Sequence, residues 1–284
     1  MIRVFVDSAS SIKQEEKEKY NVEIIPLRYL MGETEYEDGV DLSIDEFYNL
    51  LINQKLFPKT SLPFLDKVQE RVTQYTDNGD DVIIITLSSK ISGTYSALST
   101  MFEDNKHVAV IDSLTAVGGI RIMVQEINKY RDIESMESIV DKVKKLVSKI
   151  RVMAIPETLD YLLKGGRLSK KEWLIGSILK IKPVISLNEK GVTVCAKRIG
   201  LASSMKYIAN ALIEHNCDEN YPIVPSYTYS DGNLKRLIEL TDEKYKKQMI
   251  EFDNLDPAIA CHWGPNAFGF IFVSKTEEKD NEQN

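Results

Sequence analysis

Hydroxyl side chains gather directly after one buried strand of the sequence. The apolar run VIIIT at 82–86 predicts a strand, and it leads into LSSKISGTYSA at 87–97, where five of eleven residues are Ser or Thr. A helix is expected to begin near Gly93, whose missing side chain lets backbone approach a ligand closely. Hydroxyls and unpaired N–H groups at a helix start bind anions such as a carboxylate. Ser92 can equally serve as the N-cap, and the two roles are compatible.

Three other stretches place polar residues where strands or loops end. They are Asp7-Ser8 after the first strand, Thr60-Ser61 in a loop between two prolines, and Asp112-Ser113 after the strand HVAVI. In open α/β sheets ligands bind beyond the carboxyl ends of the strands, where such loops collect. These stretches therefore predict an anion site at one end of a sheet.

Histidine and arginine offer further candidates. His262 lies in CHWGPN, which is interpreted as a rigid turn before the final strand. The basic loop KGGR ends in Arg167, and Gly165 stands where a helix C′ residue belongs, so the loop is first a helix stop. Being basic, this loop could also dock a partner through Arg167. Arg198 ends the second strand of a predicted hairpin and is the other isolated cation.

Several kinds of chemistry lack their motifs. There is no GxxxxGK[ST], no GxGxxG after the first strand and no GxSxG. The three cysteines are far apart and form no CxxC pair, so neither a zinc site nor a disulfide framework is indicated. A serine hydrolase remains an alternative, with Ser92 as nucleophile, His262 as base, and Asp7 or Asp112 orienting the histidine.

Composition and charge limit the partners and the location. The 284 residues are 43% hydrophobic and 28% charged, with a formal net charge of −7, as expected of a globular protein without a preference for nucleic acid or anionic membrane. No apolar run approaches the length of a membrane span or a signal peptide. A reducing cytoplasm is the expected location, with no cofactor or metal.

The element pattern predicts an α/β protein with two domains. Strands alternate with helices up to residue 150, which favours a mainly parallel sheet, and an apolar stripe marks a helix near 136–150. After this point a hairpin is expected over 181–198, followed by further helices and the strand FGFIFVS. We expect α/β domains at 1–150 and 151–275, a disordered tail at 276–284, and a ligand site between the domains.

Taken together, these stretches resemble the DegV family of bacterial fatty-acid-binding proteins over about residues 1–274. The matching pieces, in order, are DSASS near the start, TSLP at 60–63, LSSKISGTYSA at 87–97, DS at 112–113, ETLDYLLKGGRLS at 157–169, ILKIKPVISL at 178–187, KR at 197–198 and HWGPNAFG at 262–269.

The resemblance implies two α/β domains that enclose one long-chain fatty acid between them. It implies a carboxylate held by hydroxyls, the SGT loop, a histidine and an arginine, which by position are Thr60, Ser61, Ser92, His262 and Arg198. It also implies a carrier, taken here as a monomer, that does no chemistry itself. Such a carrier presents the acid to a fatty acid kinase, which makes an acyl-phosphate for phospholipid synthesis.

The sequence departs from the family pattern beside the expected head group. Leu62 and Phe64 replace polar residues, Asn266 replaces a glycine, and Ile199 follows the arginine where a threonine is usual. Pro225 falls inside an expected strand, which should then be an edge or a break. The departures bear on chain preference and kinase docking, and they leave open a receptor for a short carboxylate or phosphate, or a scaffold with an empty cleft.

Overall fold

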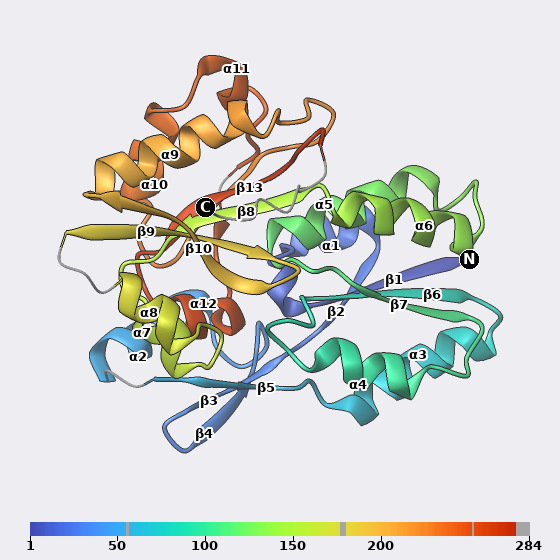
Figure 1. The fold of residues 1–284 in the computed structure, drawn as a ribbon. Helices are drawn as coiled ribbons and strands as arrows, with labels where there is room; N and C mark the ends of the chain where they lie inside the picture. Colours follow the sequence, from blue (N-terminus) through green and yellow to red (C-terminus); the bar gives the residue numbers. More distant parts are fainter. Residues whose placement is uncertain (55–56, 177–179, 252, 277–284) are drawn as a thin grey trace.

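A parallel sheet of four strands organises the first part of the chain. In the computed structural model, which describes residues 1–54, 57–176, 180–251 and 253–276, its order is β2-β1-β6-β7 (Figure 1). The strands are β1 (Ile2–Asp7), β2 (Val22–Ile25), β6 (Asp81–Thr86) and β7 (Val108–Asp112), and every neighbouring pair is parallel. The predicted parallel sheet is confirmed.

Helices cover both faces of this sheet, which explains why its strands are continuous apolar runs. Phe5, Ile84 and Val82 pack against α3 (Leu65–Asp77) and α4 (Thr94–Met101). The opposite face packs against α5 (Gly118–Tyr130) and α6 (Met136–Val147), whose apolar stripe is the one predicted from the sequence. The short helices η1 (Ser8–Ser10) and α1 (Gln14–Tyr20) follow β1.

A second, mostly antiparallel sheet forms after residue 149, in the order β10-β9-β8-β13-β11-β12. Its strands are β8 (Ile150–Ile155), β9 (Ile181–Asn188), β10 (Gly191–Ile199), β11 (Val224–Tyr227), β12 (Asp253–Asn254) and β13 (Phe268–Val273). The predicted hairpin is confirmed as β9 and β10. Pro225 lies in β11, next to the edge of the sheet, where β12 contributes only two residues. Its missing N–H therefore interrupts only a short run of strand pairing.

The helices of the second part were predicted less accurately. One face of the sheet packs against α9 (Leu201–Glu214) and α10 (Gly232–Glu239). The sequence pattern over 233–247 predicts a single helix, but α10 ends at Glu239 and a short α11 (Glu243–Lys246) begins with Asp242 as its N-cap. Two short helices, α7 (Asp160–Lys164) and α8 (Lys170–Gly176), lie between β8 and β9.

A third sheet and a buried helix correct two expectations about site residues. Thr60 and Ser61 were expected in a loop, but they belong to β5 (Lys59–Ser61), which pairs with β3 (Arg28–Met31), itself paired with β4 (Thr34–Glu37). His262 was expected in a turn, but it lies in α12 (Pro257–Trp263), a short helix that begins with a proline at its first turn. The helix α2 (Ile44–Gln54) begins after a capping box, in which Ser43 N donates to Glu46 Oε2 and Glu46 N donates to Ser43 Oγ.

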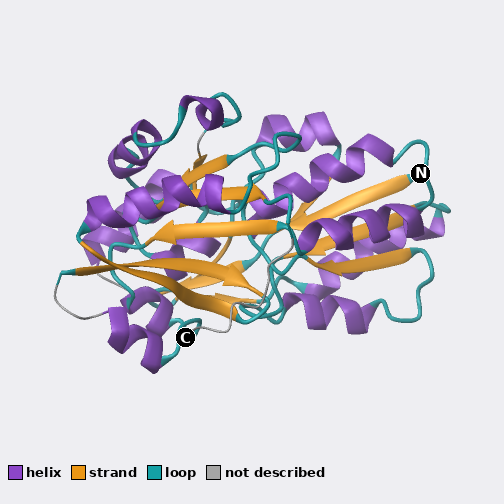
Figure 2. Ribbon diagram, turned by 45° about the horizontal axis from the view of Figure 1, so that its top comes forward, coloured by secondary structure: helices purple, strands orange, loops and turns teal. Residues whose placement is uncertain are grey.

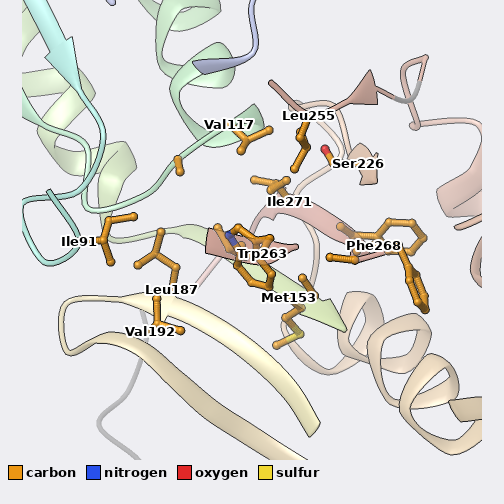
Figure 3. A pocket seen from close by; sticks show the side chains of 16 residues that line it. Ile91, Val117, Met153, Leu187, Val192, Ser226, Leu255, Trp263, Phe268 and Ile271 are labelled. Atoms are coloured by element: carbon orange, nitrogen blue, oxygen red, sulfur yellow. The ribbon is translucent and has the colours of Figure 1, made fainter. Parts of the chain in front are cut away.

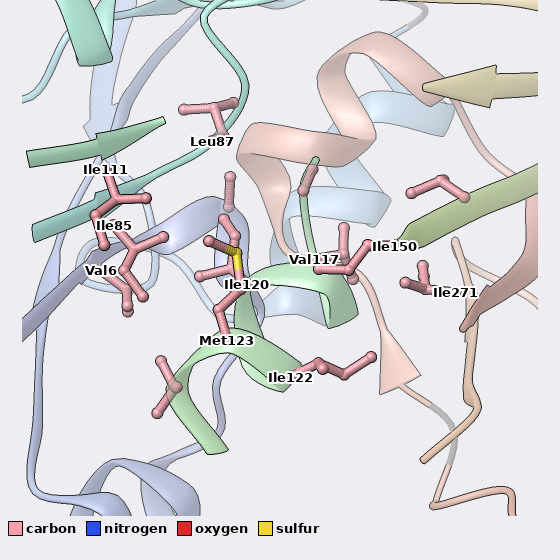
Figure 4. Packing of buried hydrophobic residues seen from close by; sticks show 14 of the residues in the cluster. Val6, Ile85, Leu87, Ile111, Val117, Ile120, Ile122, Met123, Ile150 and Ile271 are labelled. Atoms are coloured by element: carbon pink, nitrogen blue, oxygen red, sulfur yellow. The ribbon is translucent and has the colours of Figure 1, made fainter. Parts of the chain in front are cut away.

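The two main sheets share one continuous core. Val117 and Ile120 of the first part belong to the same buried cluster as Ile150 and Ile271 of the second (Figure 4). Figure 2 shows the loops of both sheets gathered between them, with helices on the outer faces. The α/β class is confirmed, while the domain boundary near 150 stays a prediction, and the tail at 276–284 lies almost entirely outside the described residues. Within the described residues, no helix is long and apolar enough to cross a membrane.

Candidate functional site

A pocket of about 310 Å³ lies where the two parts of the chain meet. It combines hydroxyls, one histidine and one arginine with apolar side chains from both parts. The residues that line it are Leu27, Thr60, Ser61, Leu62, Leu87, Ile91, Ser92, Gly93, Leu162, Arg167, Val192, Ala258, Ile259, His262 and Trp263. The pocket brings together every residue predicted to bind the carboxylate, including Gly93, except Arg198, although these residues come from segments about 30 to 200 residues apart. We call this the polar pocket.

Thr60 and His262 form the central contact of the polar pocket. Thr60 Oγ1 of β5 lies 2.8 Å from His262 Nε2 of α12. Burial, and then the nearby charge of Arg167, lower the pKa of His262 to about 3, so the imidazole is neutral near pH 7. Its Nδ1 has no hydrogen-bond partner among the described residues. A neutral ring that donates through Nε2 leaves the Thr60 hydroxyl proton available to a ligand.

The reason for Gly165 differs from the one predicted. A Cβ at Gly165 would lie 2.2 Å from His262 Nδ1, far closer than side chains approach. Gly165 itself has the ordinary φ of −71°. The left-handed residue expected at the end of α7 is instead Gly166, with φ of +73°. Gly165 is thus required by the histidine ring and not by the helix end.

Ser92 and Gly93 enter the pocket at the start of α4. Ser92 Oγ accepts a hydrogen bond from Thr94 N (3.2 Å) and lies 2.9 Å from Thr94 Oγ1. Gly93, and not Ser92, is the N-cap residue, so the hydroxyl supports the first turn from outside the helix. A Cβ at Gly93 would meet only Leu62 Cδ2, at an ordinary 3.6 Å, so protein packing does not demand this glycine.

The two arginines singled out in the sequence lie in other places than expected. Arg167 lines the polar pocket, where its Nε donates to Ile91 O (2.8 Å) and its Nη1 donates to Gly165 O. Arg198, expected at the carboxylate, is exposed at the end of β10 and stacks over the Tyr207 ring at 4.7 Å. A register shift between Val194 and Ala196 precedes it in the hairpin. No local sequence pattern reports such a shift.

An apolar pocket of about 50 Å³, shown in Figure 3, lies beside the polar pocket. Ile91, Val192 and Trp263 line both, so the two share a wall. The other residues that line the apolar pocket are Ala116, Val117, Val152, Met153, Ala154, Leu187, Ser226, Leu255, Ala267, Phe268, Gly269, Phe270 and Ile271. A polar and an apolar pocket thus lie side by side.

The remaining polar stretches of the sequence support the site from behind. Asp7 Oδ2 accepts a hydrogen bond from Leu87 N (2.7 Å), and Ser8 Oγ accepts one from Leu27 N (3.1 Å). Burial raises the pKa of Asp7 to about 7. Asp112 Oδ1 accepts from Ser89 N (2.9 Å). The two carboxylates thus fix the backbone of Leu87, which lines the pocket, and of the nearby Ser89. Neither carboxylate lines the pocket itself.

The contacts do not match those of a serine hydrolase. Ser92 Oγ is bonded within its own turn, and His262 Nε2 contacts Thr60 instead. No carboxylate orients the imidazole, because Nδ1 has no partner in the described part of the chain, and a pKa of about 3 makes it a weak base. Among the described residues no group of three or more His, Cys, Asp or Glu side chains is placed to hold a metal ion.

Fold and site together define an α/β protein with two adjoining pockets, one lined by polar and the other by apolar side chains. Residues 1–275 match the family model described as "Uncharacterised protein, DegV family". The chain belongs to the DegV family, which confirms the resemblance seen in the sequence.

Curated relatives and solved structures agree with this assignment. A DegV domain-containing protein of Clostridium acetobutylicum is 29% identical, covering 96% of this chain and 99% of that protein. A stearic-acid-binding protein of Eubacterium ventriosum is 26% identical with a TM-score of 0.81, covering 97% and 99% of the two chains. DegV of Bacillus subtilis, a fatty acid binding protein, is 25% identical with a TM-score of 0.82, covering 96% and 99%.

Proposed function

We propose that this protein binds one long-chain fatty acid, with the carboxylate in the polar pocket and the acyl chain in the apolar pocket. The observation that carries the proposal is the shared wall between a pocket of hydroxyls with one arginine and a pocket of apolar side chains. Fatty acid binding by the relatives from Eubacterium ventriosum and Bacillus subtilis supports it.

Burial of the chain provides most of the expected affinity. A chain of about fifteen methylenes at ~0.8 kcal/mol each gives a gross ~12 kcal/mol. Association and ordering oppose this by several kcal/mol. The polar contacts are then needed mainly to orient the carboxylate, which is consistent with neutral hydroxyls and a neutral histidine beside a single guanidinium.

The apolar pocket must widen to hold such a chain. Its volume of about 50 Å³ is small beside a long acyl chain, since one water in the liquid already takes about 30 Å³. Met153 lines it and is unbranched and adaptable, and Trp263 stands at the junction of the two pockets. We propose that the chain enters by displacing these two side chains.

The proposed head-group contacts come from both parts of the chain. Thr60, Ser61 and Ser92 supply hydroxyls, Gly93 supplies an unobstructed backbone, and His262 holds Thr60 in place. We assign the cation of the site to Arg167 in place of Arg198. Because Arg167 itself lines the pocket and donates to the carbonyl of Ile91 in the pocket wall, a docking role for it has less support than a head-group role.

We infer further that the protein is a carrier that presents the acid to a fatty acid kinase for acyl-phosphate formation in phospholipid synthesis. The family resemblance supports this role, and the lack of a nucleophile–base contact around Ser92 in the described residues is compatible with it. A cytoplasmic location and a monomeric state belong to the same proposal. Adding a bacterial fatty acid kinase and ATP to the stearate-loaded protein should yield stearoyl-phosphate, whereas no product would refute the carrier role.

Tryptophan fluorescence tests the binding proposal. The chain has two tryptophans, and only Trp263 lines the pockets, while Trp173 donates to Asp160 Oδ1 in a separate contact. In a Trp173→Phe background, stearic acid should change the Trp263 emission saturably at one acid per chain. Acetate at the same concentration should not. A response to acetate or phosphate equal to that of stearic acid would instead favour the short-anion receptor.

Variants of the head-group residues give a second readout of the same titration. Ser92→Ala combined with His262→Ala should weaken stearic acid binding while the thermal unfolding transition stays cooperative. Unchanged affinity in this double variant would refute the assignment of the polar pocket as the carboxylate site.

A further inference from the structure

One hydroxyl interrupts the otherwise apolar pocket. Ser226 lines it and is 4% exposed, and no other Ser, Thr or Tyr is part of the wall. Its Oγ has no hydrogen-bond partner among the described residues. Figure 3 shows the oxygen of Ser226 in the same wall as Leu255 and Ile271. Buried hydroxyls are normally paired, so this one requires an explanation.

The residues beside Ser226 on the next two strands are small. Ser226 of β11 is in register with Gly269 of β13, and Gly269 is in register with Ala154 of β8. All three residues line the apolar pocket. A Cβ at Gly269 would lie 2.1 Å from Met153 O, so a larger side chain is excluded there. On the side of β13 and β8, the neighbouring strands therefore provide no long side chain to shield or to pair the hydroxyl.

A plain hydrocarbon chain would leave this hydroxyl unpaired. Filling the pocket with methylenes removes water from around Ser226 without offering a hydrogen-bond partner, which is unfavourable for any buried polar group. A chain that carries an oxygen atom at the matching position would pair it, since a serine hydroxyl both donates and accepts. The position of Ser226 in the apolar pocket separates it from the carboxylate site, which lies in the polar pocket.

We propose that Ser226 selects acyl chains bearing an oxygen substituent, a hydroxyl or a keto group, away from the carboxylate. This inference rests on the proposed fatty acid binding and adds a substrate class to it. Ser226 would donate to a keto oxygen, and with a chain hydroxyl it would either donate or accept. Trp263 offers a second donor only where the two pockets meet, so it marks a different position along the chain.

The test compares stearic acid with octadecanoic acids that carry one hydroxyl at successive carbons. Affinities are measured for the wild type, for Ser226→Ala, and for Ser186→Ala as the matched control. Ser186 is a buried serine of the same sheet that lines neither pocket. A net hydrogen bond predicts that at least one positional isomer binds the wild type and Ser186→Ala roughly three- to tenfold more tightly than stearic acid. Ser226→Ala should lose this preference and bind stearic acid at least as well as the wild type does.

The possible failures are distinguishable. If stearic acid binds but no hydroxylated isomer binds more tightly, the selectivity of Ser226 is refuted and the fatty acid site stands. The same holds if a preferred isomer is found but Ser226→Ala keeps the preference. If neither stearic acid nor any isomer binds the wild type, the proposed function itself fails, and this inference fails with it.

Discussion

Replacing Gly165 with alanine should damage the ligand site through a residue that never touches the ligand. The added Cβ would lie 2.2 Å from His262 Nδ1 and 2.9 Å from its Cε1. The backbone at Gly165 has φ of −71°, so alanine itself is conformationally acceptable there. The ring of His262 must therefore move, and its 2.8 Å contact with Thr60 Oγ1 breaks or lengthens.

The size of the effect follows from the two parts of this perturbation. Losing a neutral hydrogen bond costs about 0.5–1.5 kcal/mol, and forcing an extra methyl into a packed site costs about 1–3 kcal/mol. If about 1–3 kcal/mol of this appears in binding, stearic acid affinity falls roughly 5- to 150-fold. Titration calorimetry or the Trp263 emission would measure the change.

Gly166→Ala is the matched control for Gly165→Ala. It adds the same methyl one residue later, where no atom lies within 4 Å. Because Gly166 has φ of +73°, alanine there should reduce the free energy of unfolding by about 1–2 kcal/mol while leaving stearic acid affinity close to wild type. The reasoning is refuted if Gly165→Ala binds like the wild type, or if both variants lose affinity equally.

Three more predictions concern ionisable side chains in the polar pocket and behind it. Arg167→Met should weaken stearic acid binding by about 1.5–3 kcal/mol, the value of a hydrogen bond to a charged group, whereas Arg198→Met should leave it within about 0.5 kcal/mol; equal losses in the two titrations would contradict the assignment. The folded-state pKa of about 3 for His262 lies below the unfolded value of 6.5, so the stability from neutral burial is complete above pH 6.5 and is lost as the pH falls toward 3. Between pH 6.5 and 5 the wild type should lose about 2 kcal/mol more than His262→Gln in urea denaturation, and parallel curves would contradict this. For Asp7 the folded-state pKa of about 7 lies above the unfolded 3.8, so the wild type should lose about 4 kcal/mol as the pH rises from 4 to 8. Asp7→Asn, which keeps an acceptor for Leu87 N, should lack that loss, and an unchanged slope would show that Asp7 is ionised in the fold.

Local patterns predicted the elements that bury a repeating face. The helix α6, the strand β6 and the hairpin of β9 and β10 all have strong periodicity or a clear turn, and each forms where it was expected. The helix α12 was missed because it has only seven residues, of which the first five are all buried, so it gives no amphipathic pattern, and Gly264-Pro265 suggested a turn instead.

The site was only partly predictable because its contacts join distant segments. The hydroxyls were found from their positions at element ends, and His262 from its unusual context. Nothing local indicates that Gly165 faces the His262 ring, or that Arg167 and not Arg198 turns into the pocket. Ser226 was missed for the same reason, since a single serine in a strand is unremarkable until its neighbours across the sheet are known.

Mass spectrometry of the purified protein tests the central claim most directly. The intact protein is measured under native conditions and again after denaturation and lipid extraction. A single long-chain fatty acid per chain, released on denaturation, is the predicted result, and its mass also shows whether the chain carries an extra oxygen. An unliganded mass that persists after incubation with mixed plain and hydroxylated fatty acids would contradict the account.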